Sequence, residues 1–194
     1  MKGRVRELVP GRGPGRQPRL STRDPRLTPR AVRRRWSGMS LPATVPDIEI
    51  GALRLRDARE LAPLLAAYNQ AMFRGAPGAP DTYYAEQLLQ DRTGEILGAR
   101  LNGELVAFLV FYDLPDPWTG MRAGLADHVF VDQRHRRKGI AKAMVDLLAD
   151  EADARGWSRL VLHAPRHGGS GRHLYEKVAG PADWSSYVIR FIDR

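Results

Sequence analysis

A basic turn between an apolar segment and an amphipathic segment is the part of this chain best suited to chemistry. A short apolar strand pattern precedes the turn, and apolar residues recur beyond Gly139 at helical spacing. Backbone N–H groups at a helix start lack intrahelical acceptors and carry the positive end of the helix dipole. Gly139 keeps that start free of a side chain, and Arg136, Arg137 and Lys138 add full charges beside it. The stretch therefore predicts an anion site, with a di- or triphosphate ester as the expected occupant.

This turn matches neither of two familiar phosphate-binding sequences. It has no G-x-x-x-x-G-K-[ST], and no G-x-G-x-x-G follows the strand. A glycine with basic neighbours also occurs at ordinary strand-to-helix turns, where the charges are simply solvated. Charge and spacing alone leave both interpretations open.

The same turn resembles the signature of a known family. Residues 136–141, RRKGIA, resemble the R/Q-x-x-G-x-G/A signature of the GNAT superfamily, the acyl-CoA-dependent N-acyltransferases. Residues 129–132, VFVD, resemble the strand that leads into that signature, and residues 173–177, HLYEK, resemble the family's late tyrosine-bearing helix. The resemblance covers about residues 48–193. Because both motifs occur in the family's order, the resemblance is specific.

The apolar patterns predict the elements that position these residues. Alternating or apolar runs predict strands at 48–55, 95–101, 104–112, 122–131, 159–164 and 184–192. Apolar residues at helical spacing predict helices at about 57–72, 81–90, 139–155 and 170–178. The sum is a mixed α/β fold, with a central twisted mixed sheet of about six or seven strands flanked by four helices. The resemblance implies a V-shaped split between the strands at 122–131 and 159–164.

The resemblance also implies a cofactor, acetyl-CoA, and no metal. Its pyrophosphate is expected on the amides of the turn, and its pantetheine on the strand backbone before the turn, like an added strand. The valine side chains of that strand are expected in the core. The expected cofactor-binding residues are Val129, Phe130, Val131, Arg136, Arg137, Lys138, Gly139, Ile140, Ala141 and Lys142.

Two residues are the expected catalytic groups. By resemblance, Tyr175 points at the sulfur and protonates the leaving thiolate, because a phenol stays protonated at neutral pH. Asp127 is the expected general base, in the strand at 122–131. Its neighbour His128 is a weaker candidate, and strand alternation predicts that the two side chains lie on opposite faces. His163 lies in an apolar strand, which favours a satisfied core histidine.

A proline-rich segment at 113–120 is expected to be an irregular loop. Its acids Asp113 and Asp116 are candidates for attracting a cationic acceptor, although loop acids are usually just solvated. The strand at 159–164, a continuous apolar run, is expected to be buried on both faces.

Composition divides the chain into a tail at 1–46 and a domain at 47–194. The chain has 194 residues, no cysteine and a net charge of +9, yet residues 1–39 carry twelve of its 31 Lys and Arg and only two of its 22 acids. The remainder is nearly neutral, so only the tail favours nucleic-acid binding. The prolines and the lack of an apolar face predict disorder in the tail. Translation from Met39 and an organelle-targeting role are alternative explanations of this segment.

Cysteine absence excludes a disulfide framework, a thiolate zinc site and a cysteine nucleophile. No apolar run is long enough for a membrane span, so the expected location is cytoplasmic and no membrane partner is expected. The leading hypothesis is an N-acetyltransferase whose acceptor is an unidentified primary amine, and a homodimer is left open. The alternatives are a non-catalytic acyl-CoA-binding module and a tail-mediated nucleic-acid binder.

Overall fold

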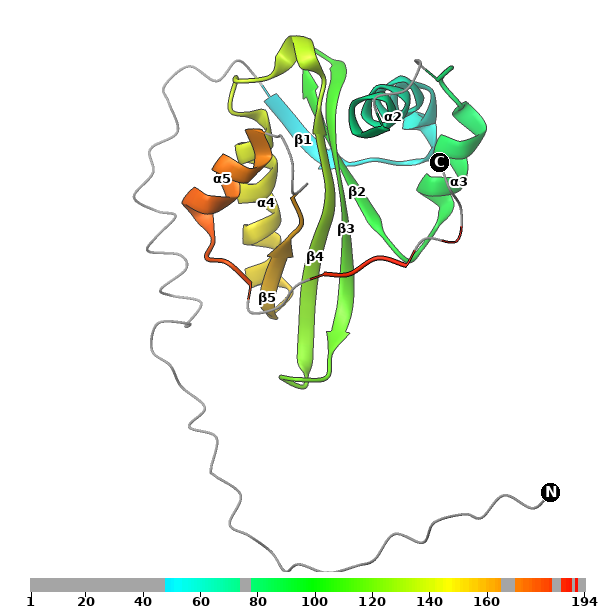
Figure 1. Ribbon diagram of the computed structural model, residues 1–194. Helices are drawn as coiled ribbons and strands as arrows, with labels where there is room; N and C mark the ends of the chain where they lie inside the picture. The colour runs from blue at the N-terminus through cyan, green and yellow to red at the C-terminus, as the bar shows by residue number, and fades with distance from the viewer. Residues whose placement is uncertain (1–47, 74–77, 165–169, 183–185, 190, 192–194) are drawn as a thin grey trace, which may run out of the picture. The chain divides into compact units, whose positions relative to one another are not determined.

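The computed structural model describes residues 48–73, 78–164, 170–182, 186–189 and 191. Five strands in these residues form one sheet in the order β1-β2-β3-β4-β5 (Figure 1). Neighbouring strands are antiparallel from β1 to β4, whereas β4 and β5 are parallel. The strands are β1 (Ile48–Ala52), β2 (Glu95–Leu101), β3 (Glu104–Asp116), β4 (Met121–Val131) and β5 (Trp157–Leu162).

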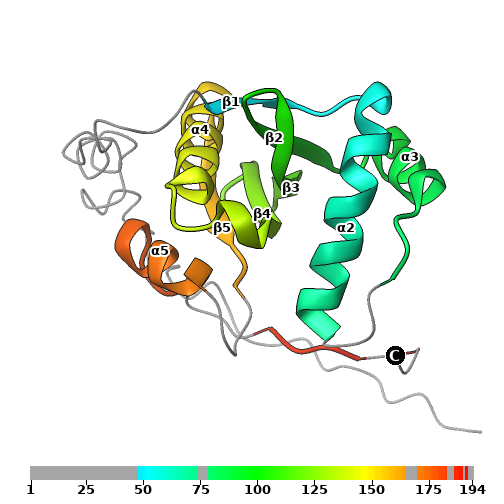
Figure 2. The same cartoon turned by 90° about the horizontal axis from the view of Figure 1, so that it is seen from above.

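Helices cover both faces of the sheet. Helices α2 (Ala58–Phe73) and α3 (Thr82–Gln90) lie on one face, and α4 (Ile140–Ala154) and α5 (Ser170–Val178) lie on the other (Figure 2). Short 3-10 turns, η2 (Leu55–Asp57) and η3 (Gln133–His135), precede α2 and α4. The mixed α/β architecture with four helices confirms the expected fold class. None of the described helices is long and apolar enough to cross a membrane.

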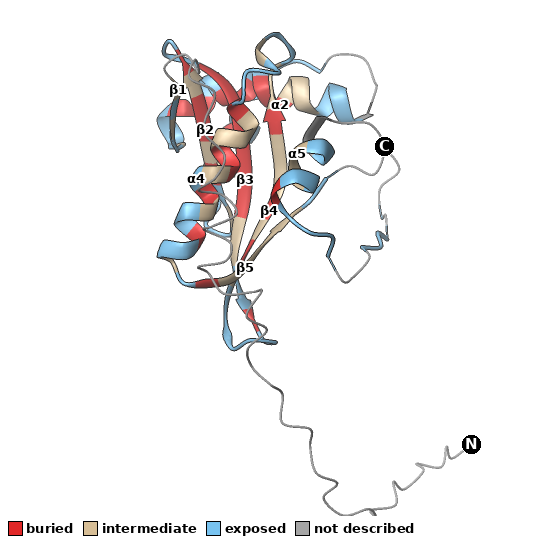
Figure 3. Ribbon diagram, turned by 90° about the vertical axis from the view of Figure 1, so that its left-hand side faces the viewer, coloured by how far each residue is buried: buried red, intermediate tan, exposed pale blue. Residues whose placement is uncertain are grey.

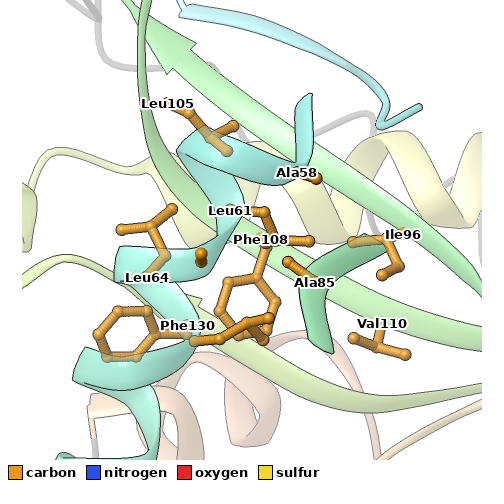
Figure 4. Close-up of a cluster of buried hydrophobic side chains, with 11 residues drawn as sticks. Ala58, Leu61, Leu64, Ala85, Ile96, Leu105, Phe108, Val110 and Phe130 are labelled. Atoms are coloured by element: carbon orange, nitrogen blue, oxygen red, sulfur yellow. The ribbon is translucent and has the colours of Figure 1, made fainter. Parts of the chain in front are cut away.

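One apolar cluster fixes α2 and α3 against the sheet (Figure 4). It joins Leu61 of α2 and Ala85 of α3 to Phe108 of β3 and Phe130 of β4, all 6% exposed or less. The ring of Tyr68 packs edge-on against both phenylalanines, with centroid distances of 5.7 and 5.8 Å. This packing places the Tyr68 side chain next to β4.

A second apolar layer holds α4 against the opposite face. Helix α4 buries Ile140, Met144, Val145 and Leu148, and it contacts β2, β3, β4 and β5. Buried residues run along β3 and the inner side of α4, whereas much of α5 is exposed or half-buried (Figure 3). Helix α4 is therefore a fixed platform for the turn that precedes it.

Three sequence predictions need correction. The described part of the predicted last strand, residues 186–189 and 191, has no regular structure, so the described sheet has five strands rather than six or seven. Strand β3 continues to Asp116 through the expected loop, because it pairs with β4 as far as Asp116 and Met121. Strand β5 is mostly half-buried rather than buried on both faces, because it is an edge strand of the described sheet. The predictions for the tail concern residues outside the described ranges.

Candidate active site

The pairing of β4 with β5 ends part-way along β4, at the last residue of β5. The parallel pairing ends where Ala126 meets Leu162, and the amide of His163 donates to the carbonyl of Ala126 at 2.9 Å. Strand β4 nevertheless continues to Val131. Residues 127–131 of β4 therefore have no β5 partner, which confirms the expected V-shaped split and frees one edge of β4.

A β-bulge lies at the vertex of this split. Val110 of β3 pairs with His128, whereas the next residue, Phe111, pairs with Ala126. Asp127 is therefore one extra residue in β4, and two residues of a bulged strand oppose one residue of its partner. The bulge cancels the alternation expected for Asp127 and His128. The prediction that these two side chains lie on opposite faces is therefore wrong.

Four side chains, from α2, β4 and the segment that follows β5, meet at the bulge. The hydroxyl of Tyr68 lies 2.8 Å from Nδ1 of His128, and Nε2 of the same ring lies 3.0 Å from Oδ2 of Asp127. The other carboxylate oxygen, Oδ1, lies 2.7 Å from Nδ1 of His163. The side chain of His163 is 45% exposed, so the prediction of a core histidine is wrong. We call these four residues the bulge cluster.

The bulge cluster has a definite direction of hydrogen bonding at one end. Burial, together with the negative charge of Asp127, raises the pKa of Tyr68 above its ordinary value. The Tyr68 phenol therefore stays protonated at neutral pH. Because Nε2 of His128 faces the Asp127 carboxylate, which can only accept, a neutral His128 ring carries its proton on Nε2, and its Nδ1 accepts from the Tyr68 phenol.

The expected anion turn is open in the structure. Arg137 and Gly139 take positive φ values of 66° and 79°, and a Cβ atom added at Gly139 would meet nothing within 4 Å. The amide of Ala143 donates to the carbonyl of Gly139 at 3.0 Å, as the first backbone bond of α4. The helical amides before Ala143, residues 140–142, therefore have no acceptor within the helix. Such groups can bind an anion at this open surface.

The basic side chains of the turn fall into two groups. Arg136 is engaged within the protein, because its Nε donates to the carbonyl of Val131 at 3.0 Å and its guanidinium lies 5.8 Å above the Phe130 ring. Lys142 is also engaged, with Nζ 2.6 Å from Asp146. Arg137 and Lys138 are exposed beside the open amides. These two residues are the charges best placed to meet an anion in solution.

These contacts also show which groups of the expected pantetheine-binding strand are free to bind a ligand. The Phe130 side chain belongs to the apolar cluster under α2, and its backbone pairs with Phe108 of β3, so Phe130 is not available to a ligand at the open edge. The carbonyl of Val131 accepts the bond from Arg136. The Val131 amide and the backbone of Val129 thus remain the candidate partners at the open edge. Val129 is half-buried, whereas Ile140 is buried beneath the turn.

Tyr175 lies on the opposite face of the sheet from Tyr68 of the bulge cluster. It lies in α5, on the face covered by α4, whereas Tyr68 belongs to α2 (Figure 2). Burial raises the pKa of Tyr175 to about 12. Its phenol is therefore a proton donor throughout the physiological pH range.

The acids of the 113–120 segment have structural partners. Asp113 pairs with Arg122 at 2.6 Å, and the Asp116 side chain is 1% exposed and lies 3.1 Å from Arg159. Burial would raise the pKa of Asp116, but hydrogen bonds from Thr119 and Ser158 and the charge of Arg159 outweigh burial and hold this pKa below its ordinary value. The idea that these acids attract a cationic acceptor is not supported, because arginines already neutralise them.

Sequence reasoning missed Tyr68 as a member of the site. It lies within the predicted helix at 57–72, where its ring fits an apolar face, and its hydroxyl gives no signal in the sequence. Its partner His128 is 60 residues away along the chain, so only the packing of α2 brings the two together.

Comparison with known proteins identifies the family of this fold and site. Residues 61–180 match the Acetyltransferase (GNAT) family. The chain belongs to the GNAT acetyltransferase family. The match spans the bulge cluster, the open turn and Tyr175, so all the candidate groups of this acetyltransferase lie within the family's domain.

Individual relatives agree with this assignment. The crystal structure of a ribosomal-protein-alanine N-acetyltransferase from Brucella melitensis biovar Abortus 2308 is 60% identical, with a TM-score of 0.69 over 75% of this chain and 99% of that chain. The uncharacterized N-acetyltransferase YhfO of Bacillus subtilis (strain 168) is 25% identical over 130 residues, which are 67% of this chain and 87% of that protein. An aminoglycoside acetyltransferase from an uncultured soil metagenomic sample, 22% identical with a TM-score of 0.62 over 75% of this chain and 99% of that chain, shares the fold.

Proposed function

We propose that this GNAT acetyltransferase transfers an acetyl group from acetyl-CoA to a primary amine, by direct attack while both substrates are bound. The observation that carries the proposal is the open amide turn at Gly139 beside the free edge of β4. The turn offers unpaired amides and two exposed cations, which suit a pyrophosphate. The free edge offers backbone groups, which suit the amides of a pantetheine arm.

The residues at the turn and the split have distinct roles in this reaction. The exposed Arg137 and Lys138, with the amides of residues 140–142, hold the phosphates, while the edge at Val129 and Val131 holds the extended arm. The amide of Val131 is suited to stabilise negative charge on the carbonyl oxygen as the amine attacks. Tyr175 gives a proton to the leaving sulfur. The bulge cluster, which includes Asp127, takes the proton from the amine.

The proposed acceptor is the α-amino group of a protein that begins with alanine. The basis is the 60% identity to the Brucella protein, whose name specifies alanine of a ribosomal protein. The aminoglycoside acetyltransferases are too distant in sequence to suggest an acceptor. We expect the reaction to take place in the cytoplasm, where both substrates are available.

The decisive test is a product assay. The full-length protein is incubated with acetyl-CoA and a hexapeptide that begins with alanine, and the peptide is analysed by mass spectrometry. The expected product is the peptide with one acetyl group at its N-terminus. The same peptide with a blocked N-terminus is the control and should stay unmodified. If neither this peptide nor a panel of small primary amines is acetylated, the proposed function is wrong.

A further inference from the structure

We infer that Nε2 of His163 accepts the proton from the attacking amine, and that Asp127 orients this ring rather than accepting the proton itself. The inference rests on the proposed function and specifies which atom of the bulge cluster performs the proton transfer. It reverses the expectation from the sequence, which placed His163 in the core and gave the base role to Asp127.

The carboxylate of Asp127 is already engaged on both sides. Its Oδ1 lies 2.7 Å from the ring of His163, and its Oδ2 lies 3.0 Å from the ring of His128. The Asp127 side chain is only 29% exposed, against 45% for His163. Each carboxylate oxygen already accepts from an imidazole and the carboxylate is the less exposed of the two groups, so an amine reaches His163 from solvent more readily than it reaches Asp127.

The hydrogen bonds select one nitrogen of one histidine. A carboxylate can only accept, so the Nδ1 of His163 that faces Asp127 carries the proton when the ring is neutral. Nε2 then presents a lone pair, and this atom has no hydrogen-bond partner among the described residues. Both nitrogens of His128 have partners, namely Tyr68 and Asp127. His128 therefore holds the carboxylate in place, whereas His163 is the residue of the bulge cluster that can accept a proton.

The location of His163 fits the proposed step. It follows β5 directly at the vertex of the split, where its amide makes the last contact with Ala126. A carboxylate that orients an imidazole and stabilises its charged form is the arrangement of well-known proton-transfer triads.

The proposed step balances in atoms and charge. A bond forms between the amine nitrogen and the thioester carbonyl carbon, and the carbon–sulfur bond breaks. The proton of the attacking nitrogen goes to Nε2 of His163, giving an imidazolium beside the Asp127 carboxylate. Tyr175 supplies the proton that the leaving sulfur takes up. Exchange with solvent then restores both side chains.

The first experiment compares histidine variants by steady-state kinetics, with acetyl-CoA and the alanine hexapeptide. His163→Ala is expected to lower kcat by about 10²-fold with the KM for acetyl-CoA within twofold, because general-base catalysis contributes ~10²–10⁴-fold. Added imidazole should restore part of this loss. His173→Gln is the matched control, because its side chain is an exposed histidine, 83% accessible, on α5. It should keep wild-type kinetics.

A second experiment determines which nitrogen of the His163 ring carries the proton, and it does not depend on activity. Long-range proton–nitrogen correlation spectra report which nitrogen of a histidine carries the proton. His163 in the wild-type protein is expected to be in the Nδ1–H form, and Asp127→Asn should shift the ring toward the Nε2–H form. The kinetic losses of Asp127→Asn and His163→Ala should also be far from additive, because both residues serve one proton transfer.

The outcomes separate the two proposals. An inactive wild-type protein on all amines overturns the proposed function, and this inference with it. An active wild type with an active His163→Ala variant overturns the inference alone. A neutral His163 ring in the Nε2–H form also overturns the inference, whatever the activity. Thermal denaturation of each variant excludes loss of folding as the cause of a kinetic defect.

Discussion

Gly139 and Gly156 stand at the two ends of helix α4, and both take positive φ, 79° and 68°. At either position an added Cβ atom would meet nothing within 4 Å. A side chain at either glycine thus costs backbone strain without a steric clash. Only Gly139 lies at the N-terminus of α4, where the free amides are. A comparison of variants at the two glycines therefore distinguishes an effect on ligand binding from an effect of backbone strain.

We therefore expect Gly139→Val to abolish measurable acetyl-CoA binding, while Gly156→Val retains it. Both variants should lose about 1–2 kcal/mol of stability, because a left-handed backbone disfavours residues with a Cβ atom. Isothermal calorimetry measures the affinity, and urea unfolding measures the stability. Equal affinities of the two variants for acetyl-CoA would remove the case for an anion site at the turn.

Tyr175→Phe should lower kcat by about 10²-fold or more while leaving the affinity for acetyl-CoA nearly unchanged, because only the proton donor is lost. Kinetics with the alanine hexapeptide and calorimetry provide the two measurements. Tyr187→Phe is a suitable control, since Tyr187 is 92% exposed. A parallel loss of turnover and affinity would show that Tyr175 binds acetyl-CoA instead of acting in the reaction.

Alkaline pH should reveal the environment of Tyr175. Its pKa is raised from 10.0 to about 12 by burial, so the unfolded state loses this proton at lower pH than the folded state. The contribution of Tyr175 to stability is therefore complete below pH 10 and is lost as the pH rises toward 12. Ultraviolet titration should show one tyrosinate transition near pH 12 that is absent in Tyr175→Phe. A midpoint near pH 10 would contradict the burial.

Arg100 should be important for stability, because it joins two acids that flank the start of α2. Its guanidinium lies 2.8 Å from Asp57 and 2.5 Å from Glu60. Arg100→Met leaves the buried Asp57 carboxylate without this cation and should cost about 2–4 kcal/mol in urea unfolding. Arg134→Met removes a pair with a 74% exposed arginine and should cost less than about 1 kcal/mol. Equal losses in the two variants would contradict this interpretation.

The same ion pair gives stability a defined pH dependence. The hydrogen bond from Arg100 lowers the pKa of Glu60 below its ordinary value. This contribution is present above the ordinary pKa of glutamate, near 4.5, and is lost as the pH falls through the lowered value. Arg100→Met should therefore flatten the acid side of the stability profile.

Gly124 is a packing constraint on the sheet. A Cβ atom there would lie 2.1 Å from the ring of Trp157, whereas one at Gly51 would meet nothing within 4 Å. Gly124→Ala should therefore cost about 1–3 kcal/mol through overpacking between β4 and β5, and Gly51→Ala should be nearly neutral. Urea unfolding measures both, and a neutral Gly124→Ala would mean that Trp157 can move aside.

Local signals in the sequence predicted the elements around the site well. The predicted strands at 95–101 and 104–112 are separated by Asn102 and Gly103, a pair typical of a tight hairpin, and both residues take positive φ, 52° and 83°. The predicted helix at 170–178 has the bounds of α5, and the predicted helix at 139–155 exceeds α4 by one residue at each end. These features depend on neighbours in the sequence, where turn and cap residues carry the information.

The bulge cluster could not be predicted in the same way. Strand alternation was the correct rule for most of β4, but the extra residue at Asp127 depends on how β4 pairs with β3. The contact of Tyr68 with His128 depends on the packing of α2. The exposure of His163 depends on where the β4–β5 pairing ends. Each is a relationship between distant segments, and the residue types involved are equally common in ordinary cores.

The bulge also divides β4 into two halves, and odd-numbered side chains point to opposite faces of the sheet in the two halves, as do even-numbered ones. Residues up to Ala126 obey one alternation, in register with β5, and residues from His128 obey the other, along the open edge. Selection can therefore act on the ligand-facing half without disturbing the half that closes the sheet. Loss of a single residue at this point would rotate one half against the other, and the side chains of the site would exchange places with those of the core.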